Sequence, residues 1–282
     1  MRSRAIFLSF LFVLTLLAGC QDEGAGSGGT PNPKRYATAV SLSPGATEIL
    51  GSRLYGITLV GRTASCNFPN PNSKAEVVMN GVKPNYERIV ELKPSIVLYD
   101  ASMFSDADLA PIKEAGIETF AITGNTVEEF VAGLYRMGSQ IGGESSLSEY
   151  VDTIYGAMAI AGGTPPNPKP KVAIIMPGQG TEHMIAGTKS FVADVVRKAQ
   201  GEPVGPDADL FVSASAESLI ELNPDLIVSS GMATSLRKDP RLASVAAIKN
   251  NRILETNPDV LLRRGSRVDK LIGGLNKFFA AP

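Results

Sequence analysis

Short runs of apolar and β-branched residues alternate with helical patterns through most of the chain. Alternation of this kind is typical of parallel βαβ units, so the pattern predicts an α/β protein. Strands are predicted at 37–42, 95–99, 117–122, 171–176, 225–229 and 252–255. Helices are predicted at 46–50, 107–115, 126–160 and 241–247.

Two distant segments share one pattern of charged and apolar residues. ERIVELKP at 87–94 and ESLIELNP at 217–224 lie 130 residues apart, and an apolar run predicted to be a strand follows each. Two Pro-Gly turns, Pro44-Gly45 and Pro177-Gly178, lie at the similar offset of 133 residues. The pattern indicates two lobes built to one plan. The alternative is that helix–proline–strand units resemble one another in any α/β protein.

A helical stretch separates the two predicted lobes. It is interrupted at Gly142-Gly143 and is followed by the proline-rich segment 165–170, which favours a boundary there. We therefore predict an N-terminal lobe at 36–124, connecting helices at 125–162 and a C-terminal lobe at 163–282. A long helix joining the lobes would make a stiff hinge. Four apolar residues are predicted to share one face of this helix: Val151, Ile154, Tyr155 and Met158.

The N-terminal residues have the pattern of a secretory signal. Arg2 and Arg4 precede an apolar run that is too short for a dependable transmembrane helix. The run ends in Leu-Ala-Gly-Cys at 17–20, which resembles the bacterial lipobox, so Cys20 is expected to carry lipid. The alternative is an ordinary signal with a chance cysteine. Residues 1–19 are thus predicted to be a lipoprotein signal peptide and 20–35 a flexible tether.

Composition excludes several classes of function. A net charge of −1 gives no basic surface for nucleic acid. One His and two Cys cannot form a His-rich metal cluster or a four-Cys zinc site. The chain has no GxSxG motif, and GTKS at 187–190 lacks the full phosphate-loop pattern. We predict a protein that is not an enzyme and has no cofactor; a secreted enzyme and a purely structural lipoprotein are the alternatives.

Five motifs together resemble a known family: VSLSPGATEIL, SCNFP, NYERIVELKPSIVL, AESLIELNPDLIV and LLRRGSRVDKLI. They are similar to the class III substrate-binding proteins of ABC importers, above all the vitamin B12-binding group with its ferric-siderophore and haem relatives. The resemblance implies the helical-backbone periplasmic-binding-protein fold, with the ligand held between two lobes. It also implies a monomer outside the cytoplasm that is anchored to a membrane through Cys20. The partner would be an ABC permease dimer with a cytosolic ATPase, and the ligand a corrinoid, or else a ferric siderophore or haem.

The resemblance also transfers ligand-contact roles to individual positions. The expected contacts are Ser65, Cys66, Gly81, Asp100, Met184, Phe211, Asp259 and Arg263. Cys66 has the alternative role of a small buried residue, and Arg263 that of a surface arginine. The chain has no Trp, so apolar contact with a planar ligand would come from Tyr99, Phe104, Phe211 and Met184.

Two acidic residues and one histidine have separate expectations. Glu87 and Glu217 match the paired acids that, in this family, contact arginines on the two permease subunits. Their alternative role is that of first-turn helix residues favoured by the helix dipole. His183 is expected in a loop after a C-terminal-lobe strand. It could be an axial metal ligand or an ordinary hydrogen-bonded side chain.

Overall fold

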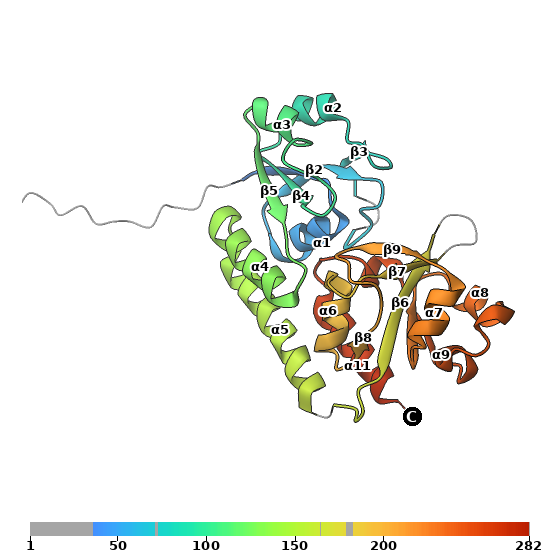
Figure 1. Cartoon of the computed structure of the whole chain (residues 1–282). Helices are drawn as coiled ribbons and strands as arrows, with labels where there is room; N and C mark the ends of the chain where they lie inside the picture. The colour runs from blue at the N-terminus through green and yellow to red at the C-terminus, as the bar shows by residue number, and fades with distance from the viewer. Residues whose placement is uncertain (1–35, 71–72, 164, 179–182, 282) are drawn as a thin grey trace, which may run out of the picture. The chain divides into compact units, whose positions relative to one another are not determined.

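The computed structural model describes residues 36–70, 73–163, 165–178 and 183–281. The predicted signal peptide, the tether and Cys20 lie outside these residues. Two β-sheets with helices packed around them make up the described part (Figure 1). We keep the predicted names, N-terminal lobe and C-terminal lobe, for the parts that contain the first and the second sheet.

The first sheet is parallel throughout, with strand order β3-β2-β1-β4-β5. Its strands are β1 (Thr38–Ser41), β2 (Thr58–Thr63), β3 (Glu76–Met79), β4 (Ile96–Asp100) and β5 (Glu118–Ile122). Its helices are α1 (Pro44–Arg53), α2 (Tyr86–Glu91) and α3 (Ala110–Glu114), the last shorter than the predicted 107–115. The three strands predicted in this lobe are confirmed, and β2 and β3 complete the sheet.

The second sheet has strand order β11-β10-β6-β7-β9, with β8 also paired to β6. Its strands are β6 (Lys171–Pro177), β7 (His183–Ala186), β8 (Glu202–Pro203), β9 (Phe211–Ala214), β10 (Leu226–Ser229) and β11 (Ile253–Glu255). Strand β7 runs antiparallel to both of its neighbours, β6 and β9, so the parallel pattern predicted for this lobe does not extend to it. Only residues 178–182 join β6 to β7, and a parallel crossover needs a dozen residues or more.

The helices of the C-terminal lobe are mostly short. They are α6 (Phe191–Lys198), α7 (Ala216–Leu222), α8 (Ala233–Lys238), α9 (Ala246–Lys249), α10 (Pro258–Leu261), α11 (Val268–Ala280) and the 3₁₀ turn η1 (Pro240–Leu242). The single helix predicted at 241–247 is wrong, because η1 ends at Leu242 and α9 begins only at Ala246.

The repeated plan of the two lobes is confirmed by the strand connections. The parallel order β1-β4-β5 in the first sheet matches β6-β10-β11 in the second. Helices α2 and α7 precede the matching strands β4 and β10. The backbone between helix and strand also has a left-handed residue at the matching position of each lobe. Lys93 has a φ of 47° and Asn223, 130 residues later, has a φ of 39°. The similarity at 87–94 and 217–224 therefore reflects one structural unit used twice.

Two helices connect the lobes, α4 (Val127–Ile141) and α5 (Glu144–Gly163), and they are separated at the interruption predicted at Gly142-Gly143. A capping box between Thr126 and Glu129 begins α4. The buried face of α5 includes Tyr150, Val151 and Ile154, and the helix packs on α11. Of the residues predicted to share one face of this helix, Tyr155 is exposed and Met158 is only partly buried.

One apolar core runs through both lobes. It joins buried residues of β1, β4 and β5 to those of β6 and β10, with α4, α5, α6 and α11 between them. Two smaller clusters cover the outer faces of the sheets. Each fully buried large aliphatic side chain contributes about 1.5–3 kcal/mol to stability. The shared core therefore fixes the two sheets against each other and positions the groups between them.

Candidate functional site

The segment Asp259–Arg267 of the C-terminal lobe lies against the strand ends of the N-terminal lobe. Parallel strands direct their carboxyl ends to one edge of a sheet, where binding sites of open α/β proteins form. Residues from this segment form buried ion pairs with acids from that edge. The candidate site is built around these contacts.

Arg264 and Asp100 form the first of these pairs. The Arg264 Nη2 and Nε atoms lie 2.5 and 3.2 Å from the two Asp100 carboxylate oxygens. Arg264 also donates to the carbonyl oxygen of Gly124 and to the Ser102 hydroxyl, both at 2.6 Å. Both charged side chains are largely buried, so each needs the other to offset its lost hydration. Asp100, a predicted ligand contact, is therefore occupied by a partner from the other lobe.

Glu48 of α1 forms ion pairs with two arginines of the same segment. Its side chain is 1% exposed. Arg267 Nη2 lies 2.5 Å from one carboxylate oxygen and Arg263 Nη1 lies 3.2 Å from it, while the Ser266 N–H donates to the other oxygen at 3.2 Å. A carboxylate buried this deeply is held in place by its four N–H donors, which belong to Arg263, Ser266 and Arg267.

Arg263 and Asp259, both predicted ligand contacts, lie side by side in this cluster and form an ion pair. Arg263 also donates to the Asn67 side chain at 2.8 Å and to the carbonyl oxygen of Ser65 at 2.9 Å. Asn67 donates to Asp259 at 2.7 Å. The structure thus brings the predicted loop at 65–67 and the predicted late loop together, but most N–H groups of Arg263 already have protein acceptors.

Two glycines permit this close approach. A Cβ atom on Gly45 would lie 2.4 Å from the carbonyl oxygen of Arg264, and one on Gly265 would lie 2.4 Å from a Glu48 carboxylate oxygen. Neither position has room for a side chain. Pro44-Gly45, the first two residues of α1, therefore serves contact with the other lobe as well as the start of the helix.

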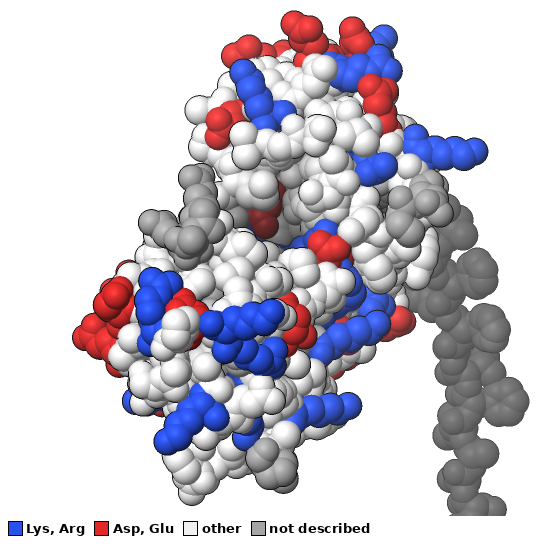
Figure 2. Space-filling model, turned by 90° about the vertical axis from the view of Figure 1, so that its right-hand side faces the viewer, with Lys and Arg blue, Asp and Glu red and all other residues white. Residues whose placement is uncertain are grey.

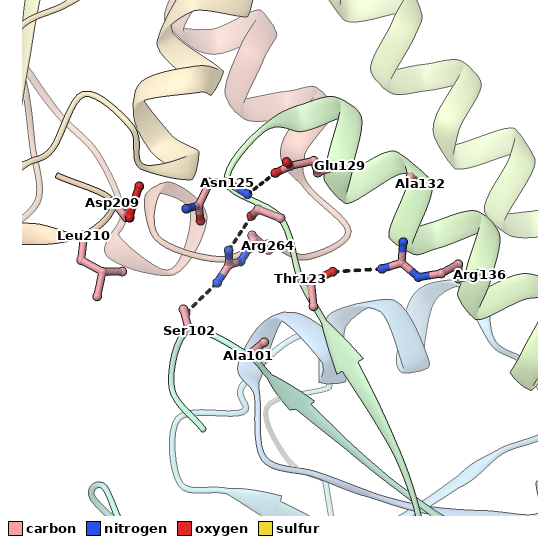
Figure 3. A pocket seen from close by; sticks show the side chains of 11 residues that line it. Ala101, Ser102, Thr123, Asn125, Glu129, Ala132, Arg136, Asp209, Leu210 and Arg264 are labelled. Carbon is pink, nitrogen blue, oxygen red and sulfur yellow. Dashed lines mark hydrogen bonds between the residues drawn. The ribbon is translucent and has the colours of Figure 1, made fainter. Parts of the chain in front are cut away.

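Two hollows lie on either side of the turn that follows β4. The larger, about 600 Å³, is lined by Ala101 and Ser102, by Arg264, and by residues of α4 and of the loops after β5 and before β9, as Figure 3 shows. The smaller, about 140 Å³, is lined by Met103 on the same turn and by residues at the ends of β1, β2 and β3. Figure 2 shows a hollow between the two lobes with charged side chains at its edge.

The ligand contacts predicted in the N-terminal lobe differ in whether they are exposed or buried. Ser65 and Gly81 line the smaller hollow. Cys66 lies beneath it, 2% exposed, with its sulfur 2.9 Å from the Thr47 hydroxyl. Its alternative role as a small buried residue is the one that this placement favours.

The apolar side chains expected to face a ligand are only partly available. Tyr99 and Phe104 are buried in the outer core of the N-terminal lobe, where their rings meet edge to face at 6.5 Å. Met184 and Phe211 are half-buried on the paired strands β7 and β9. Met103 and Leu210, which are exposed and line the two hollows, were not identified from the sequence.

His183 does not lie in a loop, as predicted, but at the start of β7. It is 8% exposed, and neither ring nitrogen has a hydrogen-bond partner among the described residues. Burial lowers its pKa below the ordinary value, and nearby Asp239 opposes that shift. His183 shares its side of β7 with Ile185, which belongs to the outer core of the second sheet.

Glu87 and Glu217 occupy the same position in the first turns of α2 and α7, and both are exposed. Asn85 caps the first helix and Ser215 the second. The pKa of Glu217 lies below its usual value because its own backbone N–H and the Ser215 hydroxyl hydrogen-bond to the carboxylate. Glu217 is therefore ionised and accessible.

The structure describes the ranges 36–70, 73–163, 165–178 and 183–281. No helix there is long and apolar enough to cross a membrane. In the same ranges, no cluster of three or more His, Cys, Asp or Glu side chains has the arrangement of a metal site.

Sequence reasoning missed the residues that organise the site. Glu48, Arg264 and Arg267 were not identified, although three arginines within 263–267 are visible in the sequence. Arg136 on α4, which lines the larger hollow, was also missed.

Comparison with known proteins agrees with this architecture. Residues 40–260 match the family described as periplasmic binding protein. The chain is 24% identical to the uncharacterized ABC transporter substrate-binding lipoprotein YvrC of Bacillus subtilis, over 95% of this chain and 94% of that protein.

Two solved structures share the fold. The periplasmic haem-binding protein BhuT in complex with two haems has a TM-score of 0.77 at 17% identity, covering 87% of this chain and 98% of BhuT. The periplasmic vitamin B12-binding protein BtuF of Vibrio cholerae has a TM-score of 0.76 at 17% identity, covering 86% of this chain and 96% of BtuF. The chain belongs to the periplasmic binding protein family, whose members are solute-binding proteins of ABC transporters and not enzymes.

Proposed function

We propose that the protein is an extracytoplasmic receptor that captures a corrinoid between its lobes and delivers it to an ABC permease. The observation that carries the ligand assignment is the lining of the smaller hollow. Its nine residues include no charged side chain, and they combine hydroxyl and amide groups with apolar ones: Leu42, Pro44, Thr63, Ala64, Ser65, Met79, Asn80, Gly81 and Met103.

A neutral lining of this kind suits a ligand with a neutral rim. The corrin ring carries amide groups around its edge, which donate and accept hydrogen bonds without charge. Ser65 and Asn80 offer matching hydroxyl and amide groups, and Met103 offers a flexible apolar contact. An anionic rim placed there would lose hydration without gaining a cation.

Haem is the second candidate, supported by the resemblance to BhuT, a protein described as binding haem. Haem carries two carboxylates, and its iron takes axial imidazole, thiolate, thioether or phenolate ligands. Met103 and Met184 are the thioethers that could approach it. His183 is a poor candidate, because it is buried on the side of β7 that faces the outer core. Its proposed role as an axial ligand would require the strand to open.

Direct titration of the purified protein tests the ligand assignment. Calorimetry with cobalamin, cobinamide, haemin and a ferric hydroxamate should give a dissociation constant below about 1 μM for the corrinoids, equivalent to roughly 8 kcal/mol. Weaker binding of both corrinoids than of haemin would move the assignment to haem. Failure of all four ligands to bind would overturn the proposed function.

Delivery and attachment complete the proposal. Glu87 and Glu217 would contact one arginine on each of two permease subunits, one acid per lobe. Their exposure at matching positions supports this role. Acylation of Cys20 would tether the receptor to a membrane on its extracytoplasmic side, and YvrC, which is described as a lipoprotein, supports that part. Mass spectrometry of the membrane-extracted protein should find the lipid on Cys20.

A further inference from the structure

The larger hollow contains an exposed cation, the guanidinium of Arg136. Arg136 of α4 is exposed, and its Nη2 atom donates to the Thr123 hydroxyl at 2.9 Å. No carboxylate of the described residues forms an ion pair with it. Arg264, the other cation of the hollow, is paired with Asp100. The carboxylate of Glu129 accepts the backbone N–H groups at the start of α4 (Figure 3).

Helix α4 places this guanidinium in the lining of the hollow. Glu129, Ala132 and Arg136 recur at helical spacing and line the same side of the hollow. The small side chain of Ala132 leaves space in front of Arg136, and the bond to Thr123 fixes the direction of the side chain. The other N–H groups of Arg136 have no hydrogen-bond partner among the described residues. A guanidinium held in this way is suited to bind a carboxylate or a phosphate through two parallel hydrogen bonds.

An acid without an ion-pair partner among the described residues lies elsewhere in the same hollow. Asp209, in the loop before β9, is exposed and lines the hollow together with Leu210. Figure 3 shows Asp209 and Arg136 on different sides of Arg264. The hollow therefore offers an acceptor for N–H groups in one part and a cation in another.

We propose that Arg136 binds an anionic group of the transported ligand, a phosphodiester or a carboxylate, while Asp209 accepts N–H groups of the same ligand. The inference rests on the proposed function and deepens it. Among corrinoids, the anionic group is the phosphodiester of the nucleotide that cobalamin carries and cobinamide lacks. In haem it is a carboxylate. Arg136 would thus decide whether the receptor prefers the complete ligand to its truncated form.

Arg136→Gln tests this assignment, with Lys249→Gln on α9 as a control that removes one exposed cation far from the hollow. Calorimetric titration of the full chain should show cobalamin binding to Arg136→Gln weakened roughly tenfold, the effect of one charge-assisted contact. Cobinamide binding should change by less than about twofold. Arg136→Lys should give an intermediate loss for cobalamin, because lysine keeps the charge but not the paired geometry.

Salt provides a second readout. Raising the salt concentration from about 0.05 to 0.5 M should weaken cobalamin binding to the wild type more than to Arg136→Gln, because salt screens an exposed ion pair. Circular dichroism should show the same thermal midpoint for the wild type and the variant.

The outcomes separate the two proposals. Weakening of haemin binding by Arg136→Gln supports the anion site and identifies a carboxylate as its ligand. Equal binding of all three ligands by wild type and Arg136→Gln overturns the role of Arg136 and leaves the proposed function standing. A wild type that binds none of the three overturns the proposed function and the role of Arg136 with it.

Discussion

The two lobes are alike on the outside and complementary on the inside. Helices α2 and α7 repeat each other in their caps, in their first-turn glutamates and in the left-handed residue that follows each helix. The facing edges differ. The N-terminal lobe contributes the buried acids Glu48 and Asp100. The C-terminal lobe contributes their ion-pair partners, which are arginines of the segment 263–267.

This difference separates two demands on a repeated unit. A surface that meets two equivalent partner subunits is served by two equal copies. An interface between the two lobes is not served by two equal copies, because like charges would then face each other and repel. The divergence of the inner edges therefore provides attraction between lobes, and the likeness of the outer helices supports the proposed twofold docking.

Glu48→Gln should break the inner complementarity most severely. Removing the charge leaves Arg263 and Arg267 with an amide instead of a carboxylate in a site that is almost fully buried. We expect a loss of about 3–5 kcal/mol in the free energy of unfolding, measured by urea denaturation. Glu76→Gln, whose carboxylate forms a partly exposed pair with Arg88, is the control and should cost much less, because solvent screens that pair. Equal losses for the two variants would contradict the special role of Glu48.

The fold was largely predictable because local patterns determine it. The runs at 95–99 and 225–229 became the fully buried strands β4 and β10, since β-branched apolar residues fit the interior of a parallel sheet. The antiparallel β7 was not predictable from its own four residues. Its direction depends on the short connection after β6, which the pattern-based assignment of strands did not consider.

The site was less predictable, because its partners are far apart in the chain. Arg263 was identified, but its contact with Glu48 spans 215 residues and depends on how α1 meets the other lobe. Nothing local distinguishes Glu48 from an exposed helix residue. The resemblance assigned ligand contacts to both loops, 65–67 and 259–263, but it did not show that their polar groups bind one another.

Asp100→Asn should weaken the second inner pair. Asp100 is less deeply buried than Glu48 and has one arginine partner, Arg264, so the expected loss is about 2 kcal/mol. Asp106→Asn is the matched control, since Asp106 pairs with Lys113 on the exposed surface. Thermal unfolding and ligand titration should be measured together. Unchanged stability with weakened ligand binding would assign Asp100 to the ligand, as the family resemblance implies, and not to the contact between the lobes.

Glu87→Gln and Glu217→Gln test whether the similar outer helices α2 and α7 act alike in docking. Each loses one exposed carboxylate at a matching position, so each should raise the receptor concentration needed for half-maximal permease ATPase activity by roughly fivefold. Ligand affinity should stay unchanged. The controls Glu91→Gln and Glu221→Gln lie four residues further along the same helices and should have little effect. An effect of one glutamate alone would show that the two copies are not equivalent in docking.

The smallest expected effect comes from exchanging a residue between the two copies. Lys93 and Asn223 both have left-handed backbone, which asparagine adopts more readily than lysine does. Lys93→Asn places the residue of the second copy into the first, and it should raise the free energy of unfolding by about 0.5 kcal/mol. The reverse exchange, Asn223→Lys, should be destabilising by about 1 kcal/mol or more, because the Asn223 side chain also accepts the Ala246 N–H at 2.9 Å. Urea denaturation of both variants measures the difference. Opposite signs would show that the two copies share one backbone geometry but have diverged in how well their residues suit it, whereas a destabilising Lys93→Asn would show that Lys93 has acquired contacts of its own.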